Sequence, residues 1–128
     1  MLFRSPCSDL TGDAALVPAV FRPERDGTNG AARDGLTRRS LIPPGSVSEI
    51  AMHDVTLAPG CRRAFEPRGP GLRELVVVLS GAVRVTVADV SDELATGDSV
   101  VVDADVPVHY ENPGQLEARC HSVVFRRA

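Results

Sequence analysis

Apolar and polar residues divide the chain into short segments that end at turn-forming residues. After Gly35, turn sequences recur at residues 43–45 (PPG), 58–60 (APG), 69–71 (GPG), 80–81 (SG), 96–98 (TGD) and 112–114 (NPG). The segments between them are rich in β-branched residues and cover 46–57, 72–79, 82–90, 98–106 and 116–125. Short segments of this kind at regular spacing are typical of an all-β sandwich or barrel. No window shows an apolar period of 3.6 residues, so we expect little helix.

The first 36 residues have a different pattern. Residues 9–12 and 22–35 are polar and rich in glycine, which predicts loops. The apolar run Ala15–Phe21 lies between them and contains Pro18, which predicts an edge strand or an extended arm. We therefore expect an N-terminal arm and loop over residues 1–36, with the arm packed on a sheet edge of its own chain or a partner's. One barrel domain is expected over residues 37–128.

Composition restricts the core and the partners. The 128 residues fit one domain, and 43% are apolar while only 4% are aromatic, so the core is expected to consist mostly of Val, Leu, Ile and Ala. The formal net charge is -3, which does not favour direct binding of nucleic acid by this chain.

The three cysteines show no CxxC spacing, so neither a disulfide framework nor a zinc site is predicted. The N-terminus lacks the apolar run of a signal peptide, and no stretch is long enough to span a membrane. The sequence therefore predicts a soluble, cytoplasmic protein.

The stretch from residue 60 to residue 81 resembles the first motif of the cupin superfamily. That motif runs glycine, five residues, His-x-His, a short spacer, glutamate, six residues, glycine, and Gly60 and Gly81 stand at its two ends here. Glu66 and Arg68 occupy the places of the two histidines, and Glu74 occupies the place of the glutamate.

The second cupin motif is also reproduced in its spacing. Gly97 begins it, Asn112 ends it, and Val108 stands in the place of its histidine. The resemblance covers residues 37–126 and implies a double-stranded β-helix, or jelly-roll, barrel. Several phrases, such as ELVVVLSGAVRV and ADVPVHYENPG, are most similar to the C-terminal cupin sensor domains of helix-turn-helix (XRE-type) bacterial regulators. Residues 1–36 do not resemble a helix-turn-helix, so either the DNA-binding half is absent from this chain or the protein is a stand-alone cupin.

The residues at the motif positions predict a degenerate metal site without a cofactor. A cupin metal site commonly uses three histidines and one glutamate, and only Glu74 is kept here. Val108 cannot bind a metal, and the Arg68 guanidinium is positively charged and has no lone pair to donate. His109 follows Val108 directly and should point to the opposite side of its strand.

We expect a ligand site formed by Glu66, Arg68, Glu74 and Tyr110, with Tyr110 in phase with Val108. The same charged cluster could instead be a structural ion-pair network that replaces the metal. No catalytic residue can be assigned.

Two functions therefore remain open. The first is a small-molecule-binding domain, a sensor module of a transcriptional regulator or related to one, that binds a small polar or anionic ligand and forms a homodimer. The alternative is a metal-independent isomerase, epimerase or cyclase with Glu66 or Glu74 as general base and Tyr110 as acid.

Other polar residues are expected to have no role in a site. His53 and Asp54 are adjacent and should point to opposite faces of a strand, so we expect His53 to be a surface or fully hydrogen-bonded histidine. Each of the pairs Arg38–Arg39 and Arg62–Arg63 is expected to divide between two faces and to be solvated.

Overall fold

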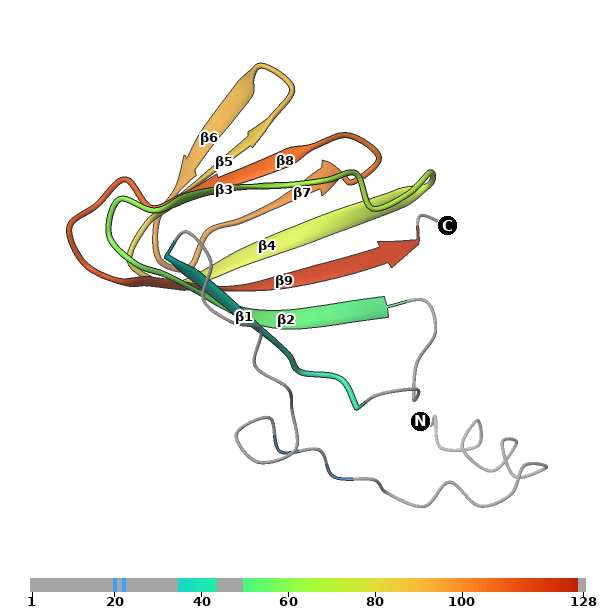
Figure 1. The fold of residues 1–128 in the computed structure, drawn as a ribbon, viewed down its shortest axis with the longest axis horizontal. Helices are drawn as coiled ribbons and strands as arrows, with labels where there is room; N and C mark the ends of the chain where they lie inside the picture. Colours follow the sequence, from blue (N-terminus) through green and yellow to red (C-terminus); the bar gives the residue numbers. More distant parts are fainter. Residues whose placement is uncertain (1–19, 21, 23–34, 44–49, 127–128) are drawn as a thin grey trace, which may run out of the picture.

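The computed structural model describes residues 20, 22, 35–43 and 50–126. Every regular element in these ranges is a β-strand, and the strands form two antiparallel sheets that face each other (Figure 1). The five-stranded sheet has the order β1 (Leu36–Ser40), β2 (Ile50–Leu57), β9 (Ala118–Arg126), β4 (Leu72–Ser80), β7 (Ser99–Asp103). The four-stranded sheet has the order β3 (Arg62–Phe65), β8 (Val108–Glu111), β5 (Val83–Val87), β6 (Val90–Leu94). The predicted all-β jelly-roll barrel is confirmed.

The core lies between the two sheets because alternate residues of each strand point inward. On β4, Glu74, Val76 and Val78 are buried, whereas Leu75 and Val77 between them are partly exposed. Val76, Val78, Val83, Val85 and Val108 are all buried in this core, in line with the expected aliphatic core. Val100 and Val102 are only partly buried, because they lie on β7 at the edge of its sheet.

Two residues of the cupin motifs have clear structural roles. Gly81 has a φ of 79°, and a Cβ there would lie 3.0 Å from Ala118, so any other residue would be strained in this turn. The Asn112 side chain is buried and donates to the carbonyl groups of Leu57 at 3.0 Å and Leu116 at 2.8 Å. Asn112 thereby ties the end of β2 to the loop before β9.

The predicted packing of the arm Ala15–Phe21 on a sheet edge lies outside the described residues, apart from Val20. Among the residues that the structure describes, none belongs to a helix that is long and apolar enough to cross a membrane.

Candidate ligand site in the barrel

A fully buried carboxylate, Glu74 of β4, lies in the barrel interior. Its Oε2 atom accepts hydrogen bonds from the Tyr110 hydroxyl group and, at 2.5 Å, from Ser122 Oγ. The same oxygen lies 3.8 Å from Arg68 Nη2. The second oxygen, Oε1, is equally buried, yet it has no hydrogen-bond partner among the described residues. Glu74 is therefore held in position through one oxygen while the other is left as an unused acceptor.

Three arginines converge on the ring of Phe65, which is buried at the end of β3. The guanidinium carbons of Arg63, Arg68 and Arg38 lie 4.8, 5.2 and 5.4 Å from the ring centroid. The backbone N–H of Arg68 donates to the carbonyl of Ala104 at 2.7 Å, which anchors this loop residue beside the barrel. Cations at this distance over an aromatic ring are attracted by its quadrupole. Phe65 therefore holds three positive charges together, and one of them, Arg68, lies 3.8 Å from Glu74.

Arg38 and Arg63 face the interior because each follows the alternation of its strand. Arg38 is two residues from Leu36, which is fully buried, and Arg63 is two residues from Phe65. Neither guanidinium forms an ion pair with an acidic side chain in the part of the chain that the structure describes. Burial lowers the pKa of Arg38, and the positive charges of Arg68 and Arg63 lower it further, against an opposing effect of Glu74 and Tyr110. Charges of like sign are thus held together in a poorly solvated space.

His53 belongs to the same interior. It lies opposite Ser122 in the pairing of β2 with β9, and its Nδ1 atom has no hydrogen-bond partner among the described residues. Burial, and then the positive charges of Arg38 and Arg68, lower the pKa of His53 from 6.5 to about 4. The imidazole is therefore neutral near pH 7. The expectation of a surface or fully hydrogen-bonded histidine is wrong, because the phase of β2 turns His53 inward and leaves its Nδ1 without a partner.

His53 should make the stability of the protein depend on pH. Because its pKa is lower in the folded than in the unfolded state, its contribution is complete above pH 6.5 and is lost as the pH falls towards about 4. We expect wild-type protein to lose about 1–2 kcal/mol more unfolding free energy than a His53→Gln variant over this interval. Urea unfolding between pH 7.5 and pH 4 measures the difference. His109→Gln, on the outer face of β8, should keep the wild-type slope, and an equal slope in the His53 variant contradicts the assignment.

Tyr110 is 1% exposed, with its ring edge-on to Phe65. Burial, and the nearby carboxylate of Glu74, raise the pKa of the Tyr110 phenol well above its usual value. Tyr110 therefore stays protonated and donates a hydrogen bond to Glu74, but it would be a poor general acid in a reaction.

The structure brings three of the four predicted site residues together: Arg68, Glu74 and Tyr110. Glu66 is exposed, because Phe65 before it points inward and β3 ends there. The sequence reasoning missed four residues of the interior: Arg38, His53, Arg63 and Ser122. The alternation of inward-pointing and outward-pointing residues along β1, β2, β3 and β9 is the signal that would have identified them.

The donor set does not fit a resident metal ion. Of the four motif positions, only Glu74 offers an inward-pointing ligand atom, and Val108 and Arg68 offer none. No group of three or more His, Cys, Asp or Glu residues that could hold a metal ion occurs in the described ranges. Two or more positive guanidinium groups beside Glu74 would also oppose a cation.

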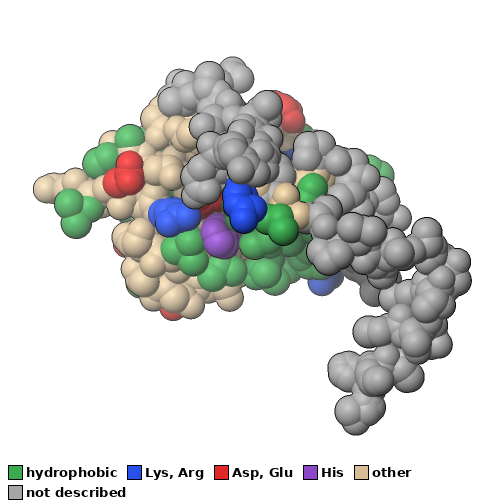
Figure 2. All heavy atoms as spheres, turned by 90° about the horizontal axis from the view of Figure 1, so that it is seen from below, with side chains coloured by type: hydrophobic (Ala, Val, Ile, Leu, Met, Phe, Trp, Pro, Cys, Tyr) green, Lys and Arg blue, Asp and Glu red, His purple; other side chains and the backbone are tan. Residues whose placement is uncertain are grey.

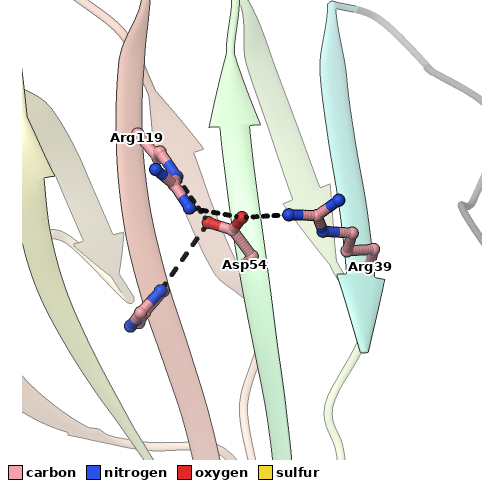
Figure 3. Close-up of polar contacts among 4 residues, drawn as sticks. Arg39, Asp54 and Arg119 are labelled. Carbon is pink, nitrogen blue, oxygen red and sulfur yellow. Dashed lines mark hydrogen bonds and ion pairs between the residues drawn. The ribbon is translucent and has the colours of Figure 1, made fainter. Parts of the chain in front are cut away.

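A second ionic cluster lies on the outer face of the five-stranded sheet. Figure 2 shows the molecule from below, with a histidine side chain between two basic side chains and apolar side chains around them, and Figure 3 shows the contacts of this cluster. Asp54 of β2 accepts from Arg119 Nε and Nη2 of β9, both at 2.9 Å, and from Arg39 Nη2 of β1 at 3.3 Å. His121 Nε2 lies 3.7 Å from Asp54 Oδ1. Burial alone would raise the pKa of Asp54, but the hydrogen bonds from Arg119 and the nearby positive charges lower it below its ordinary value. As predicted, His53 and Asp54 point to opposite faces, and this cluster is separate from the barrel interior.

The thiol of Cys120 lies in the core and does not extend the chemistry of the site. Burial, and the negative charges of Glu74 and Asp54, raise its pKa to about 12. It is therefore protonated near neutral pH, and a protonated thiol is a weak nucleophile.

Comparison with known proteins gives one family and several similar folds. A family model described as a cupin domain matches residues 53–124. The cupin domain of an XRE family transcriptional regulator from Enterobacter cloacae has 23% sequence identity and a TM-score of 0.68, over 73% of this chain and 99% of that one. No curated protein matches the chain at a significant level.

Two further structures have a similar fold. An HTH_3 family transcriptional regulator from Vibrio cholerae has 20% identity and a TM-score of 0.66 over 73% of this chain, which spans about half (52%) of that regulator. A sugar phosphate isomerase of the cupin superfamily from Silicibacter pomeroyi has 22% identity and a TM-score of 0.58, over 78% of this chain and 68% of that one. At these identities the similarity establishes the fold.

Proposed function

The chain belongs to the cupin family, and we propose that its barrel binds a small polar or anionic organic molecule without a metal. One observation carries this proposal: a fully buried carboxylate oxygen, Glu74 Oε1, has no hydrogen-bond partner among the described residues. An unsatisfied buried acceptor costs free energy, and buried polar groups in native proteins normally have a partner. A donor group of a bound molecule would satisfy it.

The other interior groups support a ligand site rather than a purely structural network. An ion-pair network that only replaced a metal would neutralise itself. Here Arg38 and Arg63 have no acidic partner among the described residues, and His53 Nδ1 is also unsatisfied. Small-molecule sites use a few placed polar groups to orient a ligand.

We further propose that the barrel is a sensor module of a transcriptional regulator, or is related to one. Two structures of similar fold are described as transcriptional regulators, and one of these is a cupin domain that this chain covers almost completely. In this proposal residues 37–128 bind the ligand in the cytoplasm, residues 1–36 form an arm and loop, and this chain makes no direct contact with nucleic acid.

A thermal-shift screen tests the proposed function. Metal-free protein is heated with a library of small metabolites that includes anionic, neutral and cationic compounds. A compound that binds only the folded state raises the melting temperature, by an amount that grows with its concentration. We expect stabilising compounds that lose their effect on a folded Glu74→Gln variant. A library without any such compound, or with compounds that stabilise both proteins equally, contradicts a ligand site at Glu74.

A metal-independent enzyme is the second candidate, and one contact favours it. Tyr110 donates to Glu74, so a proton donor and a carboxylate lie side by side, and a cupin of similar fold is described as a sugar phosphate isomerase. The raised pKa of Tyr110 opposes proton transfer from it near neutral pH. Exchange of substrate C–H protons with deuterated solvent, catalysed by wild type and absent with Glu74→Gln, would establish the enzyme.

The proposed absence of a metal is directly measurable. Among the motif positions only Glu74 points a carboxylate inward, and Arg68 lies beside it. We therefore expect elemental analysis of purified protein to show well below one transition metal ion per chain. About one iron, zinc, manganese or nickel ion per chain, lost in a Glu74→Ala variant, would contradict the metal-free site.

We propose a homodimer that packs through the outer face of the five-stranded sheet. The pairing register places Val101, Leu75, Val123 and Met52 in one row across β7, β4, β9 and β2. Val101 is 51% exposed, and an apolar row of this kind is typical of an interaction surface. Light scattering should give the mass of a dimer for wild type and of a monomer for Val101→Glu. A wild-type monomer at micromolar concentration contradicts the proposal.

A further inference from the structure

We propose that the molecule bound in the barrel is a small hydroxylated oxyanion. Its carboxylate or phosphate group pairs with Arg38 and Arg63 beside Phe65, and one of its hydroxyl groups donates to Glu74 Oε1. This inference rests on the proposed function and specifies the chemistry of the ligand.

The arginines select the anionic group. Arg38 and Arg63 lie over the same ring, both face inward, and neither has an acidic partner in the described part of the chain. Guanidinium groups donate in a planar fork that matches carboxylate and phosphate oxygens. An oxyanion between them would also reduce the repulsion among Arg38, Arg63 and Arg68. A neutral molecule would leave that repulsion in place.

Glu74 selects the second group of the ligand. Its Oε1 atom can only accept a hydrogen bond, and a second anion beside it would be repelled. The ligand must therefore have a donor at the end that meets Glu74. A hydroxyl group fits better than an ammonium group, because Arg68 lies 3.8 Å from the same carboxylate and would repel a further cation. His53 Nδ1 offers a second neutral hydrogen-bonding position for a further hydroxyl group.

Isothermal titration calorimetry with a matched set of three-carbon probes tests this chemistry. Glycerate and glycerol 3-phosphate carry both an oxyanion and hydroxyl groups, glycerol carries only hydroxyl groups, and propionate only the carboxylate. Inorganic phosphate serves as the anion without carbon. We expect glycerate, glycerol 3-phosphate or both to bind, and glycerol, propionate and phosphate to bind at least about tenfold more weakly. The comparison of glycerate with glycerol 3-phosphate identifies which oxyanion is preferred.

Adjacent arginines of β3 provide a matched pair of variants. Arg63→Gln removes an inward guanidinium, and we expect it to weaken binding of the preferred probe about tenfold or more. Arg62→Gln removes an exposed guanidinium from the opposite face and should leave the affinity unchanged. Arg38→Gln is a second interior variant, and a melting curve for each protein confirms that it is folded.

The outcomes separate this inference from the proposed function. Equal affinity for propionate and glycerate, equal effects of the Arg62 and Arg63 substitutions, or no binding by either hydroxylated anion would overturn the inference. If the metabolite screen then finds a neutral or cationic compound whose effect depends on Glu74, the proposed function stands without it. If the screen finds no such compound, both fail.

Discussion

Replacing Arg68 with alanine is expected to lower the unfolding free energy by about 3 kcal/mol, the usual scale for breaking a buried ion pair. The substitution removes the ion-pair partner of Glu74, which is fully buried, and leaves its hydrogen bonds from Tyr110 and Ser122. Urea unfolding of a double-mutant cycle with Arg68→Met and Glu74→Gln isolates the interaction. We expect a coupling energy above about 1 kcal/mol.

The chain provides a matched control for this pair. Arg73 and Asp103 lie 3.7 Å apart, close to the 3.8 Å between Arg68 and Glu74, but both of their side chains are exposed. Arg73→Ala should therefore cost well under about 1 kcal/mol. A coupling energy near zero for Arg68 and Glu74, or equal costs at Arg68 and Arg73, would show that the interior ions do not interact.

Replacing Asp54 with asparagine should cost about 2–3 kcal/mol near neutral pH, because the carboxylate joins Arg119, Arg39 and His121 across three strands. Since the pKa of Asp54 is lowered in the folded protein, its stabilisation is complete above its unfolded pKa of about 4 and is lost as the pH falls below that value. Urea unfolding of both proteins at pH 7 and pH 3 tests this.

The difference in unfolding free energy between wild type and Asp54→Asn should therefore shrink between pH 7 and pH 3. Asp103→Asn, which removes an exposed carboxylate from an ion pair, is the control and should show little difference at either pH. A cost at Asp54 that stays constant down to pH 3 would mean that the lost stability comes from packing rather than from charge.

The sequence predicts the fold well because turns and alternation are local properties. The turn sequences mark most of the strand ends, and the buried valines of β4 and β5 follow the period of two. The segment 82–90, expected as one strand, is two strands, β5 and β6, joined by a tight turn at Ala88 and Asp89. Ala88 adopts a φ of 55°, a conformation that alanine rarely takes, so the sequence carries no turn signal there.

The site is predicted in part because its members come from several strands. The motif spacing correctly brings Arg68, Glu74 and Tyr110 together. Arg38 and His53 lie on β1 and β2, the first two strands of the five-stranded sheet. Each has a polar neighbour in the sequence, and only the alternation of inward and outward side chains along the strand shows which of the two points inward. That phase is fixed by the pairing of β2 with β9, a long-range contact that local patterns do not reveal.

Two residues of the cupin motif spacing have structural roles that do not depend on a metal. Gly81 allows a turn in which any other residue would be strained, and Asn112 donates to carbonyl groups at two places in the chain. These residues shape the barrel whatever it binds. Arg68 and Val108 stand at the places of two histidines of the motif, and there the side chains present pair with Glu74 and pack in the core.

The most direct test of the ligand site is an NMR titration that follows the arginine side-chain Nε–Hε signals while the most stabilising compound from the metabolite screen is added to metal-free protein. We predict saturable shifts for the interior arginines, Arg38, Arg63 and Arg68, with one common dissociation constant. Arg84, which pairs with Glu93 and Glu111 on the outside of the barrel, should not shift. Shifts confined to exterior arginines, with the interior signals unchanged at saturation, would contradict a ligand site inside the barrel.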